Sequence, residues 1–123
     1  KVGQPVCRVR RLRLADAEPL AIEDVCVSFI GCERLLETDL EHDSLYRILT
    51  ETFDMPPVTA EQEIEADLAE AEDAKLLDIA PGDPVLRTRR VTSTRRGQPI
   101  EYAQSVYRGD KYRFYTRLAR EFR

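Results

Sequence analysis

The sequence predicts a single α+β domain, in which a mostly antiparallel sheet of about six strands carries helices on one face. Segments with alternating polarity lie near both ends of the chain, and turn-like sequences of a few residues join them at three places. Such short connections are typical of antiparallel neighbours. Two segments of helical character lie between these ends, and the 123 residues are about the length of one domain.

The first two strands are expected at 6–14 and 20–29. Val6–Leu14 is rich in Val, Leu and Arg, and Leu20–Phe29 returns after the turn-like residues Asp16-Ala17-Glu18. The pattern indicates a hairpin. A short helix or turn is expected at Cys32–Thr38.

A helix is expected to begin after Asp43, which is a favourable N-cap residue. Apolar residues then recur at helical spacing, so one stripe of the helix should face a core. Met55-Pro56-Pro57 ends the segment, because proline cannot continue a helix. The apolar stripe consists of Leu45, Ile48, Leu49 and Phe53.

The second half of the chain predicts four strands and one helix. Val58–Asp67 is ambiguous, but its alternation of acidic and apolar residues favours a strand, and Ala69–Leu77 has helical composition. The turn at 95–98 contains the glycine that a tight hairpin needs. The remaining strands are expected at Val85–Thr94, Ile100–Arg108 and Lys111–Leu118.

Composition indicates a globular domain, with 42% apolar and 34% charged residues and no apolar run of the roughly 20 residues that span a bilayer. The three cysteines, Cys7, Cys26 and Cys32, form no metal-like pattern, so buried thiols in a reduced, cytoplasmic setting are expected. Because the chain begins with Lys1 rather than Met, we expect it to be part of a longer protein.

The charge is unevenly distributed. Residues 15–83 hold 20 of the 23 acidic residues and only 3 of the 19 basic ones. The net charge of −4 argues against direct binding of nucleic acid by this segment. Two interpretations remain open: acidic helices over a sheet with arginine on one face, or a dedicated surface for polyanions.

Arg11 and Arg13 suggest an anion site together with the helix that starts near Ser44. The two arginines lie on the same face of a strand, about 7 Å apart by strand geometry, and guanidinium groups bind phosphate or carboxylate in a bidentate manner. Ser44 and Tyr46 would bring hydroxyl groups to the first turn of the helix. The alternatives are arginines paired with a carboxylate on a neighbouring strand, and a capping segment with Tyr46 on the surface.

A second polar set comprises Glu23 on the second strand and Glu101, Tyr102 and Tyr107 on the fifth. Glu101 and Tyr107 are six residues apart and therefore share one face of a regular strand. A carboxylate and a phenol on one face suit sugar hydroxyls or an amine, whereas the alternative is cross-strand pairing of Glu101 with Arg87 or Arg89.

Other kinds of site find no support. His42 is the single histidine, and the five glycines form no phosphate-binding loop. We therefore expect no catalytic residues, no metal and no cofactor.

The motifs taken in order resemble the UTRA domain, the effector-binding half of HutC-type regulators of the GntR superfamily. The first half of the chain contributes Arg11-Leu12-Arg13, residues 18–23 and Ser44-Leu45-Tyr46. The second half contributes Pro84-Val85-Leu86, residues 97–102, and Ser105-x-Tyr107-Arg108 with Asp110. The resemblance covers nearly the whole chain, although Ala17 stands where the family's hairpin usually carries glycine.

The resemblance implies a chorismate lyase-like fold, a homodimer, and an upstream winged helix-turn-helix domain, absent from this chain, that binds DNA. It implies that Arg11, Arg13, Ser44 and Tyr46 hold an anion, and that Glu23, Glu101 and Tyr107 contact the rest of the effector. The expected effector is a phosphosugar, an amino-sugar phosphate or a small carboxylic acid. Residues 1–123 would then be one effector-binding domain of a cytoplasmic bacterial transcription regulator.

Two alternatives to this sensor remain at the level of sequence. One is a chorismate lyase-like enzyme that acts on a small carboxylate with the same pocket. The other is a dimerisation module without a ligand.

Overall fold

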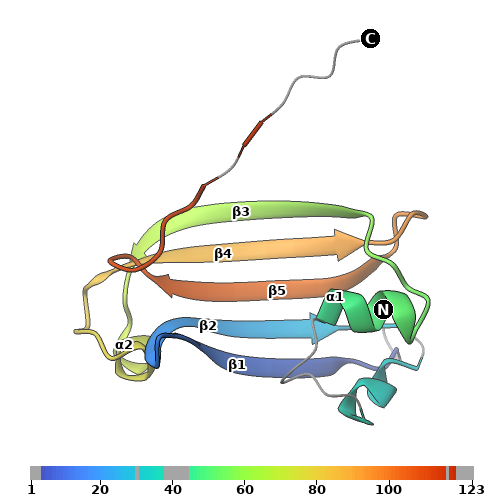
Figure 1. The fold of residues 1–123 in the computed structure, drawn as a ribbon, viewed down its shortest axis with the longest axis horizontal. Helices are drawn as coiled ribbons and strands as arrows, with labels where there is room; N and C mark the ends of the chain where they lie inside the picture. Colours follow the sequence, from blue (N-terminus) through green and yellow to red (C-terminus); the bar gives the residue numbers. More distant parts are fainter. Residues whose placement is uncertain (1–3, 30, 38–44, 116, 119–123) are drawn as a thin grey trace.

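The computed structural model describes residues 4–29, 31–37, 45–115, 117 and 118. The domain is α+β, with one five-stranded sheet in the order β1-β2-β5-β4-β3, and every pairing is antiparallel (Figure 1). The strands are β1 (Cys7–Ala15), β2 (Glu18–Val27), β3 (Thr59–Leu68), β4 (Pro84–Ser93) and β5 (Pro99–Arg108). Two α-helices, α1 (Leu45–Glu51) and α2 (Ala71–Leu77), and a 3-10 helix, η1 (Cys32–Glu37), accompany the sheet.

Five of the six predicted strands are confirmed, including the ambiguous segment that became β3. The prediction of a sixth strand at Lys111–Leu118 is wrong, since the described residues of that range form no strand. The reason lies in β5, whose two sides are taken by β2 and β4. The chain leaving β5 therefore has no adjacent strand to pair with. Instead, the Tyr112 N–H donates to the Arg108 carbonyl at 3.0 Å.

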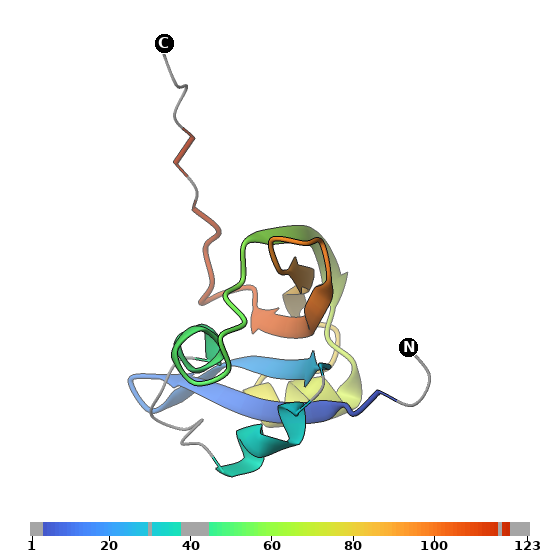
Figure 2. The ribbon, with the colours of Figure 1, turned by 90° about the vertical axis from the view of Figure 1, so that its right-hand side faces the viewer.

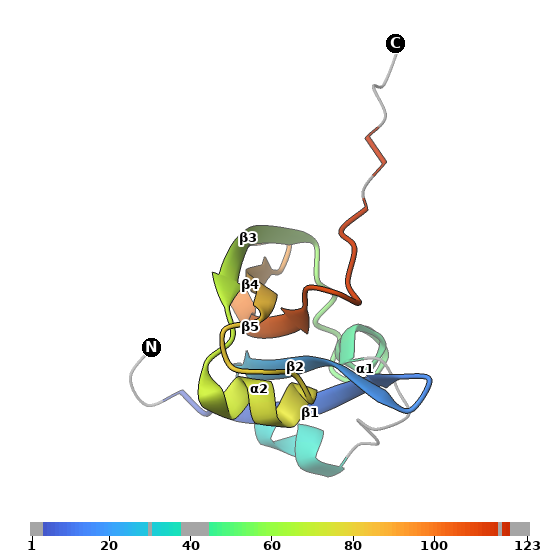
Figure 3. The same ribbon diagram turned by 90° about the vertical axis from the view of Figure 1, so that its left-hand side faces the viewer.

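The prediction that the helices cover one face of the sheet is also wrong. Leu77 of α2 packs with Ile22 and Val106, whereas Tyr46 of α1 donates a hydrogen bond to Glu101. Val106 and Glu101 are five apart on β5 and so point to opposite faces. The two helices accordingly lie on opposite sides of the molecule (Figures 2 and 3).

Each face has its own hydrophobic cluster. The larger cluster joins β2 residues such as Val25 and Val27 to Leu45, Ile48 and Leu49 of α1, which confirms the apolar stripe that the sequence predicts. Cys7 and Cys32 are buried in it, and all three cysteines are free thiols. Among the described residues, no helix is long and apolar enough to cross a membrane.

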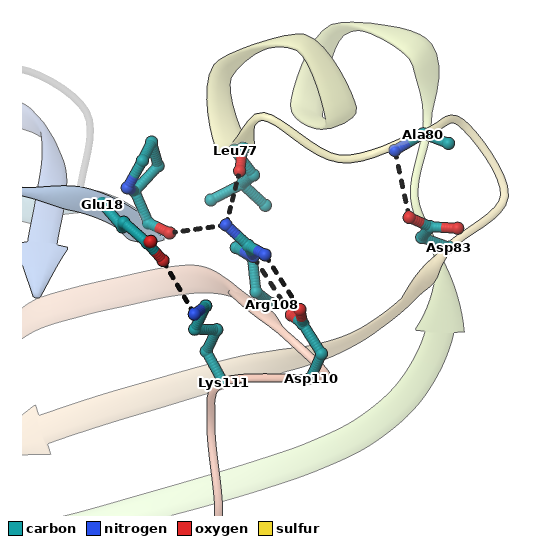
Figure 4. A network of polar contacts seen from close by, with 8 residues as sticks. Glu18, Leu77, Ala80, Asp83, Arg108, Asp110 and Lys111 are labelled. Carbon is teal, nitrogen blue, oxygen red and sulfur yellow. Dashed lines mark hydrogen bonds and ion pairs between the residues drawn. The ribbon is translucent and has the colours of Figure 1, made fainter.

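Arg108 ties together three parts of the chain at the end of β5 (Figure 4). Its guanidinium donates to both carboxylate oxygens of Asp110, at 3.1 and 2.8 Å. It also donates to the carbonyls of Pro19 and Leu77, each at 3.4 Å. The Leu77 carbonyl belongs to the last turn of α2, where a cation is favourable. Arg108 thus joins β5 to the start of β2 and to α2.

The hairpin between β1 and β2 turns through Asp16 and Ala17, whose φ angles are +50° and +66°. A two-residue turn with positive φ at both positions matches the twist of the strands, but the left-handed conformation suits glycine and asparagine better than alanine. Ala17 therefore sits in an unfavourable backbone conformation.

Replacing Ala17 with glycine should stabilise the domain by about 1 kcal/mol, because glycine adopts positive φ without a steric penalty. Urea denaturation of Ala17→Gly against the parent chain measures the difference. Ala15→Gly is the matched control: Ala15 lies in strand β1, so glycine there should destabilise the domain. A decrease in stability for Ala17→Gly would contradict the assignment of strain.

Candidate functional site

A cavity of about 690 Å³ lies on the face of the sheet that α1 covers. All five strands, α1 and the segment after β5 contribute residues to its wall. The wall includes six of the seven site residues that the sequence predicts: Arg11, Arg13, Glu23, Tyr46, Glu101 and Tyr107. The seventh, Ser44, lies outside the described residues, as do His42 and Asp43, so the predicted cap and anion contact at the helix start stay predictions.

Arg11 and Arg13 share one side of β1, as predicted, and both lie near Glu23 on β2. The Arg11 Nη2 to Glu23 Oε1 distance is 3.4 Å, and the Arg13 Nη1 to Glu23 Oε2 distance is 3.5 Å. The strand register explains this, because Arg11 lies opposite Glu23. The pairing with a neighbouring carboxylate, one of the alternatives from the sequence, is thus present. The arginine side chains remain 38% and 57% exposed, against 14% for Glu23.

Tyr46 does not lie on the surface, as one alternative supposed, but reaches from α1 down to the sheet. Its hydroxyl donates to Glu101 Oε1 at 2.8 Å and lies 3.1 Å from the Thr92 hydroxyl. The guanidinium of Arg90 lies over its ring, 5.4 Å from the ring centre. Burial raises the pKa of the Tyr46 phenol, and the nearby Glu101 carboxylate raises it further, against a lowering by Thr92 and Arg90.

Glu101 is the most deeply buried charged residue described in the cavity wall, with a side chain only 1% exposed. Its Oε1 accepts hydrogen bonds from Tyr46 at 2.8 Å and from Thr92 at 2.7 Å. The Arg90 Nη2 lies 3.6 Å from the same oxygen. The contacts of this carboxylate with Tyr46, Thr92 and Arg90, among the described residues, all involve Oε1.

Pairing of Glu101 with Arg87 or Arg89 is wrong. Arg87 lies on the opposite face, where its Nε donates to Asp67 at 2.7 Å and its Nη1 lies 3.4 Å from Asp73 of α2. The cause is a shift of register between Thr92 and Ser93, which places Thr92 opposite Glu101. A shift of one residue exchanges the faces of every following side chain, so Arg90 rather than Arg89 shares the face of Glu101.

Tyr107 shares the cavity face with Glu101, as predicted, and stacks on Tyr112. The ring centres are 4.1 Å apart with planes at 28°. Burial raises the pKa of Tyr107, and the charge of Glu23 adds to the effect. Tyr112 therefore closes one end of the cavity with an aromatic surface.

Sequence reasoning missed five polar wall residues. Gln62, Thr88 and Ser105 share the cavity face through strand register, and Arg90 and Tyr112 were described above. The alternation of β4 and β5 shows which residues of each strand share a face. The strand register is needed to tell which of the two faces lines the cavity. Among the described residues, no group of three His, Cys, Asp or Glu side chains is placed to hold a metal ion.

The arrangement suits recognition of a small polar anion. Three arginines and two glutamates line one cavity, and half-buried phenols and hydroxyl side chains can supply directional hydrogen bonds. Guanidinium groups bind phosphate or carboxylate oxygens, while carboxylates accept from hydroxyl or amine groups.

Comparison with known sequences and structures gives a consistent set of relatives. Residues 1–113 match the sequence profile of the UTRA domain family. The chain is 37% identical over 114 residues to the HTH-type transcriptional repressor NagR of Bacillus subtilis, covering 91% of this chain and 46% of the relative. It is 30% identical over 118 residues to the histidine utilization repressor of Pseudomonas putida, covering 96% and 46%. The chain spans about half the length of the curated relatives it matches.

Solved structures show the same fold. The C-terminal domain of the histidine utilization repressor from Pseudomonas syringae pv. tomato has 31% identity and a TM-score of 0.84, covering 98% of this chain and 83% of that one. The effector domain of PhnF from Mycobacterium smegmatis has 25% identity and a TM-score of 0.87, covering 98% and 74%.

The shifted tyrosines give a test of the site geometry. The folded protein holds the phenolic protons of Tyr46 and Tyr107 more tightly than the unfolded chain does. This contribution to stability is complete below the ordinary tyrosine pKa of about 10 and is lost as the pH rises above it. In a titration followed by phenolate absorbance, Tyr46→Phe should therefore show a smaller rise than the parent at the high-pH end of the curve, where Tyr46 ionises.

The control for this titration is the same pair of proteins in urea. Once unfolded, the parent and the variant should differ in amplitude alone, because no phenol is buried. A loss from the early part of the folded titration curve would contradict the position of Tyr46 against Glu101.

Proposed function

Since the chain belongs to the UTRA family, we propose that it is the ligand-sensing and dimer-forming domain of a bacterial transcription regulator of the GntR/HutC type. Its ligand is a small anionic metabolite. The observation that carries the proposal is the single cavity at which arginines of β1, glutamates of β2 and β5, and a phenol of α1 meet.

Arg11 and Arg13 form the anion end of the proposed site. Their contacts with Glu23, at 3.4 and 3.5 Å, are longer than the roughly 2.8 Å of a good charge-assisted hydrogen bond. A phosphate or carboxylate at ordinary hydrogen-bond distance would bind these guanidinium groups more closely than Glu23 does. Ser44 and the first backbone N–H groups of α1 are proposed to complete this end.

Glu23, Glu101 and Tyr107 form the selecting end. The described contacts of Glu101 occupy Oε1, and we assign Oε2 to a hydroxyl or amine of the ligand. Tyr107 supplies a phenolic hydroxyl on the same face. A ligand with a negative group at one end and hydrogen-bond donors at the other satisfies both sets.

The ligand classes that fit are a phosphosugar, an amino-sugar phosphate and a small carboxylic acid. Ligand cavities of about 300 to 1,000 Å³ are common, and this one has about 690 Å³. The relatives carry the names of regulators, which favours a sensor over the chorismate lyase-like enzyme.

Regulation follows from differential affinity. A ligand that binds one arrangement of the dimer better than another shifts the population toward it, by no more than the difference in binding free energy. In this proposal DNA is bound by an upstream domain, and the sensor domain changes how two such domains are held.

Titration calorimetry with hexose phosphates, amino-hexose phosphates and small carboxylic acids tests the proposal. Arg11→Ala should raise the dissociation constant of the best ligand by roughly 10- to 100-fold, as expected for one charged hydrogen bond. The matched control is Arg8→Ala. Arg8 lies on the face of β1 opposite to Arg11, where its Nε donates at 2.8 Å to Asp24 of β2. Unchanged affinity in Arg11→Ala, or an equal loss in Arg8→Ala, would refute the assignment.

A further inference from the structure

Strand β3 forms one free edge of the sheet. It pairs with β4 on one side and ends the strand order on the other. All ten of its residues are exposed. An edge strand of this length presents a row of backbone N–H and C=O groups that can pair with another strand.

The side chains of β3 sort by face into acidic and mostly apolar rows. The acidic row consists of Glu61, Glu63, Glu65 and Asp67, and the strand carries no basic residue. Ala60, Ile64 and Ala66 alternate with these acids and therefore lie on the other face. Ile64 is 38% exposed. The edge is thus acidic on one face and mostly apolar on the other, where Gln62 is the polar exception.

The described residues after Tyr112 have the complementary pattern. Arg113, Tyr115 and Arg117 alternate with Phe114 and Leu118. We call residues 113–115, 117 and 118 the tail. Phe114, Tyr115 and Leu118 are 49%, 80% and 89% exposed, so the tail presents large apolar side chains to solvent. As a strand it would be basic on one face and apolar on the other.

The tail lies apart from its own β3 (Figures 2 and 3). Lys111 is held by Glu18 at 2.7 Å, and Tyr112 is stacked on Tyr107, so the tail begins at a fixed place at the end of β5. From there it extends beyond the body of the domain in every view (Figures 1 to 3). An extended segment with exposed apolar side chains is suited to binding a second molecule.

Charge distinguishes the two edges of the sheet. The other edge strand, β1, carries Arg8, Arg10, Arg11 and Arg13 and no acidic residue. A basic tail would be repelled there, whereas β3 places opposite charges across the new strand pair. Opposite charges across a strand pair stabilise it and like charges destabilise it.

We propose that the tail of one copy of this chain adds as a sixth strand to the β3 edge of a second copy, reciprocally. Arg113 and Arg117 then face the acidic row of β3, and Phe114 and Leu118 cover its apolar row. The inference rests on the proposed function for the existence of a dimer and names the two segments that form it. Because both patterns have a period of two, they match for either strand direction.

Sedimentation equilibrium of the whole 123-residue chain tests the proposal. The parent should have twice its monomer mass of 14.2 kDa. Reversing the edge with Glu61→Lys and Glu63→Lys should raise the dimer dissociation constant roughly tenfold or more, because like charges then face each other across both strand pairs. Reversing the tail with Arg113→Glu and Arg117→Glu should do the same.

The matched control is Glu33→Lys with Glu72→Lys. It changes the net charge as the edge reversal does, at exposed acidic residues of η1 and α2, and should leave association unchanged. Equal weakening in this control would mean that net charge, and not the β3 edge, governs association.

Mixing the two reversed variants separates exchange between copies from docking of the tail on its own strand. In the mixed dimer the reversed tail meets the reversed edge, and the unmodified tail meets the unmodified edge. Association should therefore return in the mixture of two weakly associating variants. Failure of the mixture to associate, or a parent-like mass for either variant alone, overturns the inference.

Calorimetry on the same variants keeps this inference separate from the proposed ligand site. A monomeric parent chain contradicts the proposed dimer and the strand exchange together. A dimeric parent whose association ignores the reversals contradicts the exchange alone. Ligand binding that persists in the reversed variants leaves the sensor proposal intact in both cases.

Discussion

A carboxylate with very little access to solvent needs hydrogen-bond donors, and in this domain that need helps to position α1. Glu101 has a side chain only 1% exposed, and an unpaired charge at such a depth costs several kcal/mol. Tyr46 from α1 and Thr92 from β4 supply donors to it. The described part of this helix has seven residues, and a helix of that length is too short to be stable by itself. Its place over the sheet comes from this polar contact and from the apolar stripe beside it, and Leu45 and Tyr46 of α1 contribute to the cavity wall.

Successive side chains of each strand point to opposite faces of the sheet, so the two faces have different roles. On one face, β2 and β5 present Glu23, Glu101 and Tyr107 to the cavity. On the other, Ile22 and Val106 of the same strands pack against α2, and Arg87 holds Asp67 and Asp73. Neighbouring residues of one strand therefore have different roles, one lining the cavity and the next packing against α2. The face beneath α2 supplies apolar burial and a rigid support, so the cavity face can retain charges that contribute little to stability.

The sequence predicts most of this fold because its signals are local. Alternation identified β1 to β5, and the glycine of the 95–98 turn, Gly97, has a φ of +78° as a tight hairpin requires. The failures concern what no local signal contains. The irregularity after Thr92 shifts the register, so counting back from the turn selects Arg89 instead of Arg90 as the neighbour of Glu101. The Lys111–Leu118 segment has the alternation of a strand, but β5 offers it no free side. Alternation predicts that a segment can form a strand. Whether a partner strand is available depends on the order of the strands in the sheet.

The contacts of Glu23 indicate how binding of an anion in this cavity could change the interactions within the domain. A ligand changes an equilibrium only through groups whose interactions differ between the free and the bound state. Glu23 lies within 3.5 Å of both Arg11 and Arg13, so an anion bound at these arginines in the proposed site would compete with it directly. β2 is a central strand, paired on both sides, and does not yield easily. The short helix α1 is joined to the sheet by side-chain contacts of Tyr46 and its apolar stripe, whereas β2 is hydrogen-bonded along both edges. In the proposed function, a ligand that reorganises the charges beneath α1 would therefore act on the helix before it acts on the central strands.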